Sequence, residues 1–167
     1  DYRLIGGVRF ATDFNSNEYL LSFENLKGRW DKQFIFHRQV FRASSTQSLI
    51  KTYTHELMFI LKYPFSQVAA IRGTAMFRND RSVFLSTDLG NLNEPDIIKP
   101  WGGLKVDFTF DNTRPLGINL LQGLRFKLFA EGYKQIDQRK SDLVVLGADF
   151  RHYTRIHRSL IWANRFA

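Results

Sequence analysis

The chain has 167 residues and a formal net charge of +8, and its 44% apolar and 24% charged residues are typical of a folded protein. Its length favours a single domain. The absence of cysteine excludes a disulfide framework, a thiolate zinc site and an iron–sulfur cluster. The longest apolar runs, Leu57–Leu61 and Leu143–Leu146, are far shorter than the roughly 18 residues that a membrane-spanning helix needs. A helical membrane protein is therefore excluded, whereas a membrane protein built of strands is not.

Apolar and polar residues alternate with a period of two along most of the chain, which predicts strands rather than helices. In chain order, the predicted strands are Tyr2–Asp13, Glu18–Leu26, Lys32–Ala43, Lys51–Tyr63, Ala69–Arg78, Trp101–Asp111, Gly123–Tyr133, Val144–Arg151 and Ser159–Phe166. The alternation is clearest in Trp101–Asp111, where Leu104 points one way and Lys105 the other. The first three segments are noisier, and in the third of them Arg38 shares the parity of Phe36.

Short polar or turn-forming stretches separate these segments. They are Asn15–Asn17, Ser44–Thr46, Tyr63–Ser66, Asn79-Asp80, Thr87–Pro100, Asn112–Pro115 and Gln138–Ser141. No shift in composition marks a linker or a second domain. The sequence thus predicts an all-β fold, an antiparallel up-and-down arrangement of about nine or ten strands, in one domain that spans residues 1–167.

Three features favour a transmembrane β-barrel over a soluble β-sandwich, although alternation alone fits both. Several strands run for about ten to twelve residues, the length that a tilted strand needs to cross a bilayer. Trp and Tyr residues such as Trp30, Tyr63 and Trp101 fall near strand ends, as the interfacial girdles of outer-membrane barrels require. The polar faces of neighbouring strands carry charges of both signs, as a barrel lumen does. The charged residues that we expect to face the lumen are Lys105, Asp107, Asp111, Arg125, Lys127, Glu131, Asp149 and Arg151.

A soluble fold remains the alternative at this point. A charged strand face fits a solvated outer surface, and aromatic residues at strand ends also pack small cores. The barrel pattern is weak in any single strand, so it gains weight only across many neighbouring strands.

The string from Asp107 to Gly117, Asp-Phe-Thr-Phe-Asp-Asn-Thr-Arg-Pro-Leu-Gly, resembles the strand–turn element D-x-R … P-x-G of the bacterial surface-antigen barrels, the superfamily of BamA and TamA. The stretch from Leu146 to Tyr153 looks like the next hairpin of that family, in which a D-x-R-x-Y strand precedes an apolar strand that ends in arginine. The chain is also similar to the barrel that follows a TolB-like propeller in some relatives. The residues that match the family motifs are Asp111, Arg114, Pro115, Gly117, Asp149, Arg151 and Tyr153.

This resemblance implies a protein of the outer membrane of a Gram-negative bacterium that helps to insert or translocate proteins or lipids, or to assemble the envelope. It implies outer-membrane lipid, lipopolysaccharide and other envelope protein subunits as partners. Because the family's barrel has about sixteen strands, we expect a segment of a larger barrel whose first and last strands do not pair with each other. The alternative is a small complete barrel that serves in adhesion, in lipid binding or as an embedded hydrolase.

No catalytic, cofactor-binding or metal site emerges from the sequence. His152 and His157 flank a presumed turn, but no Asp, Glu or third His stands at ligand spacing, and two histidines are too few for zinc. No motif surrounds any serine or histidine that could form a nucleophile–base pair. We therefore expect a protein that is not an enzyme and that binds no cofactor.

The positive charge, with a pI of about 9.9, is compatible with nucleic acid binding. The basic residues are, however, spread along the chain and mixed with acidic ones, and no RNA-binding or helix-turn-helix pattern is present. Clusters such as Lys27, Arg29 and Lys32 fit contacts with anionic lipid headgroups at least as well. We expect no nucleic acid partner.

Overall fold

The computed structural model describes residues 1–167 except 12, 45–48, 86–94, 118–119, 138–140 and 159. The described residues form ten β-strands and one short 3-10 turn, η1 (Phe14–Ser16). The strands are β1 (Tyr2–Arg9), β2 (Glu18–Asn25), β3 (Asp31–Ser44), β4 (Leu49–Pro64), β5 (Ala69–Leu85), β6 (Ile97–Asp111), β7 (Arg114–Gly117), β8 (Leu120–Gln135), β9 (Asp142–His157) and β10 (Leu160–Phe166). In this part of the chain, no helix is long and apolar enough to cross a membrane.

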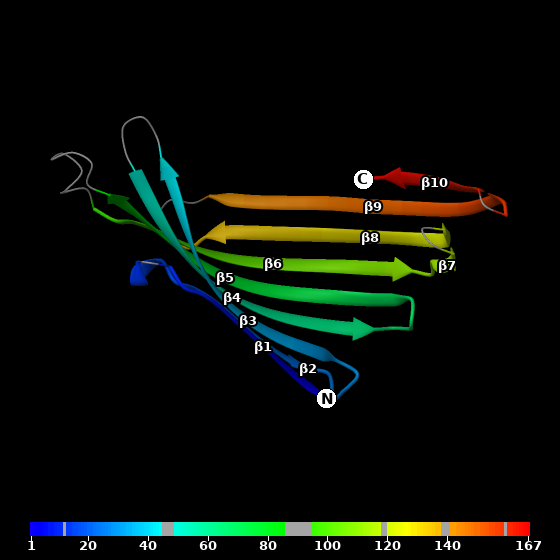
Figure 1. Ribbon diagram of the computed structural model, residues 1–167, viewed down its shortest axis with the longest axis horizontal. Helices are drawn as coiled ribbons and strands as arrows, with labels where there is room; N and C mark the ends of the chain where they lie inside the picture. Colours follow the sequence, from blue (N-terminus) through cyan, green and yellow to red (C-terminus); the bar gives the residue numbers. More distant parts are fainter. Residues whose placement is uncertain (12, 45–48, 86–94, 118–119, 138–140, 159) are drawn as a thin grey trace.

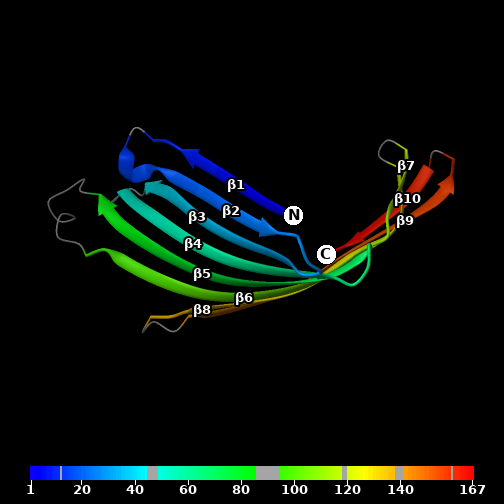
Figure 2. The same ribbon diagram turned by 90° about the horizontal axis from the view of Figure 1, so that it is seen from below.

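The strands form one antiparallel sheet in a single layer (Figure 1). Strands that follow one another in the chain are hydrogen-bonded, except that β6 pairs with β8 and the short β7 pairs with β8 beyond the end of β6. The sheet is strongly curved, as Figure 2 shows, and it is open: among the described residues β1 pairs only with β2, and β10 only with β9. The predicted all-β, antiparallel, up-and-down architecture of nine or ten strands is confirmed.

The connections between strands fall at two ends of the sheet because neighbouring strands run in opposite directions. The connections after β2, β4 and β9 lie at one end, which we call the short-turn end. The connections after β1, β3, β5 and β8 lie at the other, the long-connection end.

Six of the strands are 14 to 17 residues long, which exceeds the predicted length. One reason is that the predicted turn Asn79-Asp80 is wrong, because both residues lie inside β5. The Asp80 carboxylate accepts hydrogen bonds from Thr54 Oγ1 at 2.7 Å and from Arg78 Nε at 2.9 Å, so its polar group is satisfied without leaving the strand. The end of the predicted loop Thr87–Pro100 likewise belongs to β6, while residues 86–94 lie outside the described residues.

The predicted turn Asn112–Pro115 is correct for Asn112 and Thr113 only, because Arg114 and Pro115 belong to β7, which pairs with β8. The Asn112 N–H donates to the Leu124 carbonyl at 3.0 Å, and the Leu124 N–H donates to Asn112 Oδ1 at 2.7 Å. A side-chain oxygen thus replaces a missing backbone acceptor. The interruption has the character of a β-bulge, which lets the strand bend while its pairing continues.

The remaining boundaries differ from the predictions at strand ends only. The predicted strand Tyr2–Asp13 ends at Arg9, because the Asp13 carboxylate caps η1 by accepting from Asn15 N at 2.9 Å and from Ser16 Oγ at 2.8 Å. The predicted turn Tyr63–Ser66 begins inside β4, which continues to Pro64. The predicted turns Ser44–Thr46 and Gln138–Ser141 lie mostly outside the described residues.

The sheet has no apolar core on either side. Among the described residues no apolar side chain is buried, whereas six polar or charged ones are: Asn17, Ser22, Lys51, Thr54, Asp107 and Gln135. This distribution is the reverse of that in a water-soluble domain, whose layers pack around a hydrophobic core.

Candidate functional site

The register separates the side chains of the sheet into two faces, because residues directly opposite each other on neighbouring strands point the same way. Lys105 of β6 lies opposite Glu131 of β8, and Lys127 of β8 lies opposite Asp149 of β9. Alternation along each strand then places all eight residues expected in the lumen on one face of the sheet: Lys105, Asp107, Asp111, Arg125, Lys127, Glu131, Asp149 and Arg151.

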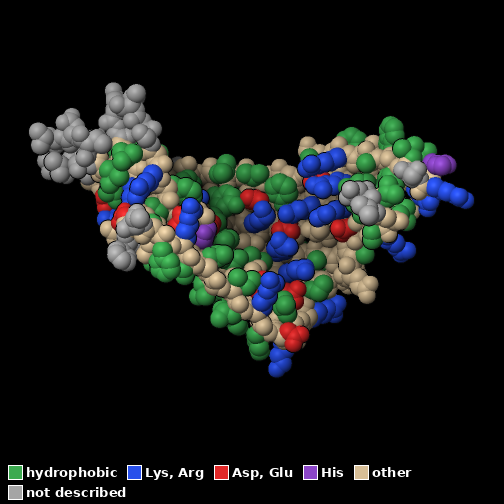
Figure 3. Space-filling model, in the orientation of Figure 1, with side chains coloured by type: hydrophobic (Ala, Val, Ile, Leu, Met, Phe, Trp, Pro, Cys, Tyr) green, Lys and Arg blue, Asp and Glu red, His purple; other side chains and the backbone are tan. Residues whose placement is uncertain are grey.

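This charged face is the concave one, because its side chains are the more enclosed: Asp107 is buried there, whereas its chain neighbour Val106 on the other face is exposed. One hollow of about 380 Å³ is lined by Glu56, Arg78 and Asp80 together with aromatic side chains. Another, of about 460 Å³, lies nearer the short-turn end and includes Arg72 and Asp107 in its lining. Figure 3 shows charged side chains gathered across the middle of the sheet. We call it the concave face.

Ion pairs cross the concave face from one edge of the sheet to the other. Lys105 Nζ contacts the Glu131 carboxylate, whose second oxygen accepts from Tyr133 Oη at 2.9 Å. The other pairs on this face are Arg3–Glu24 at 3.8 Å, Arg9–Glu18 at 3.4 Å, Lys62–Asp31 at 3.7 Å, Arg78–Asp80 at 2.9 Å, Arg125–Asp111 at 3.5 Å, Arg151–Asp149 at 2.7 Å and Arg165–Asp149 at 3.2 Å. Charges of both signs are thus arranged as partners across the face.

Asp107 is the most enclosed side chain of this face, with only 2% of its surface exposed. Arg72 lies opposite it on β5, and Phe129 lies opposite it on β8. Its Oδ2 atom is buried and makes no hydrogen bond within the described part of the chain. A carboxylate that is buried in this way needs water or another donor to remain charged.

The opposite face, which we call the convex face, is apolar and exposed. Leu104 and Leu146, for example, are 69% and 75% exposed. An aromatic row crosses this face near the short-turn end, from Trp30 in the connection after β2 to β8. Its ring centroids are 4.8 Å apart for Trp30–Tyr63, 5.3 Å for Tyr63–Phe65, 6.3 Å for Phe65–Phe108, 5.8 Å for Phe108–Phe126 and 5.3 Å for Phe126–Phe110.

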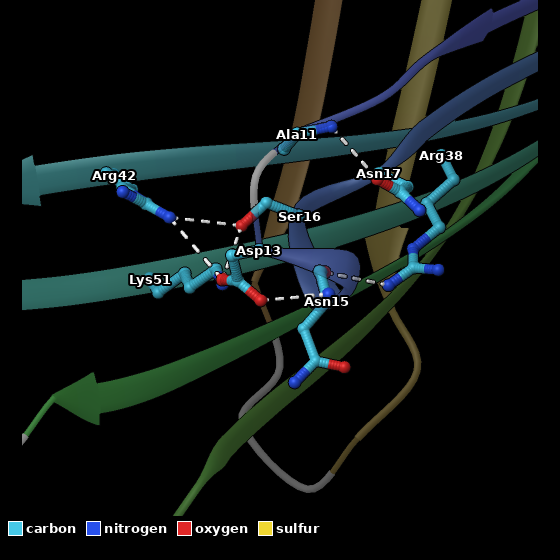
Figure 4. A network of polar contacts seen from close by, with 8 residues as sticks. All are labelled: Ala11, Asp13, Asn15, Ser16, Asn17, Arg38, Arg42 and Lys51. Atoms are coloured by element: carbon cyan, nitrogen blue, oxygen red, sulfur yellow. Dashed lines mark hydrogen bonds and ion pairs between the residues drawn. The ribbon is translucent and has the colours of Figure 1, made fainter.

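Near the long-connection end, the apolar surface gives way to tyrosine and basic residues. The Arg38 guanidinium lies 5.6 Å from the ring centroid of Tyr19 and 5.9 Å from that of Tyr53. Beyond it, the connection after β1 is fastened to β3 and β4, as Figure 4 shows: Asp13 binds Lys51 at 2.5 Å and Arg42 at 3.5 Å. The end of β3 that carries Arg38 therefore has polar rather than apolar neighbours on the convex face. For this reason Arg38 shares the parity of Phe36, which disturbs the alternation in the sequence.

The apolar band of the convex face has a definite height. Tyr53 and Tyr63 lie on the same face of β4, near the two borders of the apolar band. At about 3.3 Å per residue they are roughly 33 Å apart along the strand. At the tilt of about 40° that is typical of barrel strands, this length would project to roughly 25 Å. That is the height of the apolar band in outer-membrane barrels.

The family-motif residues fall at two places in the fold. Asp111 lies before the bulge, where its carboxylate accepts from the Thr113 N–H at 3.1 Å and faces Arg125. Arg114, Pro115 and Gly117 form most of β7 and are exposed. The remaining three, Asp149, Arg151 and Tyr153, follow one another on the concave side of β9. Arg165 of β10 is not among the motif residues, and its distance of 3.2 Å from Asp149 depends on the pairing of two strands.

Among the described residues, no three His, Cys, Asp or Glu side chains gather in a way that could hold a metal ion. Neither a scan of protein-family models nor searches of curated proteins and solved structures returns a match to this chain. The two faces of the sheet are therefore the features from which a function can be inferred.

Proposed function

We propose that this chain forms the wall of an outer-membrane β-barrel, with its convex face against lipid and its concave face toward an aqueous lumen. The observation that carries the proposal is the reversed distribution of polarity, in which apolar side chains are exposed and the enclosed side chains are polar. A single curved layer of this kind is unstable in water, because an exposed apolar sheet face requires a second layer. In a bilayer the lipid chains cover that face instead.

The borders of the convex face support the same arrangement. The aromatic row lies at one border, Tyr19 and Tyr53 lie at the other, and the distance between the borders suits the apolar thickness of an outer membrane. Basic side chains such as Arg29, which lies 4.7 Å from the Tyr63 ring centroid, and Arg42 are placed where anionic headgroups of lipid or lipopolysaccharide lie. An aqueous lumen also supplies water to the buried Oδ2 atom of Asp107.

The proposal has a consequence for the two edges of the sheet. Backbone groups that stay unpaired in the hydrocarbon region cost several kcal/mol each, so β1 and β10 each need a further strand as a neighbour in the membrane. In the structure they do not pair with each other. This favours a wall that is completed by other strands over a small closed barrel of these ten strands.

The resemblance to the surface-antigen barrels is the sole basis on which we propose a function for the whole barrel. On that basis we propose a Gram-negative outer-membrane protein that takes part in protein insertion, translocation or envelope assembly, together with other envelope subunits. It would act by opening its wall or by guarding a pore, without covalent chemistry.

Site-directed spin labelling of β9 tests the membrane arrangement, and the cysteine-free chain allows one label at a time. In the barrel completed by its neighbouring strands and reconstituted in lipid vesicles, labels at Val144, Leu146 and Ala148 should be accessible to oxygen, which concentrates in the bilayer. Labels at Val145, Asp149 and Arg151 should be accessible to a water-soluble nickel chelate. If all six labels were accessible to the nickel chelate, the sheet would not lie in the membrane and the proposal would be wrong.

The cellular role needs a separate measurement. Depletion of the protein in its host should lower the amounts of other outer-membrane proteins or of surface lipid. Unchanged amounts would contradict the assembly role without affecting the membrane arrangement that the spin labels report.

A further inference from the structure

Three arginines lie side by side on the concave face near the short-turn end. Arg125 of β8 is directly opposite Arg151 of β9, which is directly opposite Arg165 of β10. We call these three residues the arginine ladder. Like charges directly opposite each other on neighbouring strands destabilise a sheet, so this arrangement needs compensating anions.

The chain itself supplies only part of that compensation. Asp149 accepts from Arg151 through both oxygens, at 3.0 and 2.7 Å, and from Arg165 at 3.2 Å. Asp111, in the same row on β6, lies 3.5 Å from Arg125. Two carboxylates therefore serve three guanidinium groups.

A fourth cation increases the excess of positive charge. Lys127 lies opposite Asp149, but both oxygens of that carboxylate are already bound by arginine. The described residues hold no carboxylate within ion-pair distance of the Lys127 amino group, which instead lies 5.7 Å from the Phe129 ring centroid. The cluster of Arg125, Lys127, Arg151, Arg165, Asp111 and Asp149 thus carries a net charge of +2.

The cluster is accessible from the concave side. Arg125 and Arg165 are 52% and 62% exposed at their side chains. In the next row toward the short-turn end, the ladder borders on Gly123 and Ala163, which lie on either side of Tyr153. Ala163 adds only a methyl group to that row, whereas Asn112 and Thr113 fill the space beside Gly123.

We propose that the arginine ladder and Lys127 form a binding site for the phosphate group of a small anionic solute. The planar guanidinium group donates two parallel hydrogen bonds to a phosphate, and rings of Arg and Lys line the pores that pass phosphate. A phosphate dianion matches the net charge of the cluster. The site faces away from the convex face, so the headgroup of a bilayer lipid does not reach it, and the site exists whether or not the sheet lies in a membrane.

Titration of the 167-residue chain with inorganic phosphate at low ionic strength, in a zwitterionic detergent and followed by calorimetry, tests the site. We expect saturable binding that weakens as salt is added. The double variant Arg125→Gln/Arg165→Gln should bind on the order of tenfold more weakly, because two charged donors are lost. Asp111→Asn should bind several-fold more tightly, since it releases Arg125 and keeps an oxygen that accepts from Thr113.

Arg3→Gln is the matched control, because it removes an exposed arginine of the same face at the opposite edge of the sheet. This variant should bind phosphate as the unchanged chain does. Absence of saturable binding, or equal binding by the double variant, would overturn the proposal. If the double variant loses its β-sheet circular dichroism, the single variants Arg125→Lys and Arg165→Lys are tested instead. Each should bind phosphate more weakly, because lysine keeps the charge but cannot donate the bidentate pair of hydrogen bonds.

Two further ligands define the chemistry of the solute. Glycerol 3-phosphate should bind like inorganic phosphate if the site takes phosphate monoesters, and more weakly if it takes the free ion. Succinate should bind more weakly than both. Succinate binding at equal strength would contradict the assignment to phosphate and indicate a site for carboxylates.

Discussion

The backbone carbonyl of Asn112 lies so close to Gly123 that a Cβ atom placed on Gly123 would be 2.8 Å from the carbonyl oxygen. Gly123 also has a φ of 127°, a conformation that other residues rarely adopt. The interruption at Asn112 and Thr113 therefore depends on a residue without a side chain on the neighbouring strand. The close approach holds the end of β8 against the chain between β6 and β7.

Replacement of Gly123 by alanine should destabilise the sheet by about 1–3 kcal/mol, because it adds both backbone strain and a steric clash. The midpoint of urea unfolding, followed by tryptophan fluorescence in detergent, measures the change. Gly73→Ala is the control, since nothing lies within 4 Å of a Cβ atom at that position. Equal midpoints for the two variants would show that the close approach does not constrain the fold.

Leu146→Arg distinguishes a membrane wall from a soluble sheet. Leu146 is 75% exposed, so in water the substitution should change the free energy of unfolding by less than about 0.5 kcal/mol. Near the middle of a bilayer it should cost roughly 2–4 kcal/mol, because the guanidinium group would enter hydrocarbon. Unfolding in lipid vesicles measures the difference.

Val145→Arg provides the comparison for that experiment. Val145 is the preceding residue on β9 and points to the concave face, where the new guanidinium group would remain on the polar side of the sheet. Its effect should be small in either environment. Equal costs for the two substitutions in vesicles would mean that the faces are not sorted between lipid and water.

The Asp13 carboxyl group should stay ionised in strongly acidic solution. Hydrogen bonds from Lys51, from Ser16 and from the Asn15 backbone lower the pKa of Asp13 from 3.8 to about 2. Because the folded pKa is depressed, these contacts stabilise the connection after β1 at any pH above about 4, and the contribution is lost as the pH falls toward 2.

Carbon-13 NMR of the Asp13 carboxyl group measures this titration directly. Lys51→Met should move the pKa of Asp13 back toward its ordinary range, because the strongest of the three contacts is removed. A midpoint near 4 in the unchanged chain would show that Asp13 does not fasten the connection to β3 and β4.

Local alternation in the amino-acid sequence is enough to predict the central part of each strand and the side chains that share a face within it. The period-two alternation is a local property of each strand, so it was sufficient to predict an all-β, up-and-down sheet and to group Lys105, Asp107 and Arg125 together. Strand ends were less predictable. Asn79 and Asp80 have the composition of a turn, yet Thr54 on the neighbouring strand satisfies the Asp80 carboxylate and the strand continues.

Which residues meet across the sheet depends on how the strands pair. Arg165 and Asp149 are 16 positions apart, and their contact depends on the register of β9 and β10, which no local pattern specifies. The same holds for the arginine ladder and for the approach of Gly123 to Asn112. Cross-strand neighbours depend on the pairing of whole strands, and a shift of one residue would exchange the two faces. For this reason the sequence indicated the charged face, while the arrangement of its charges emerged only when the strands were paired.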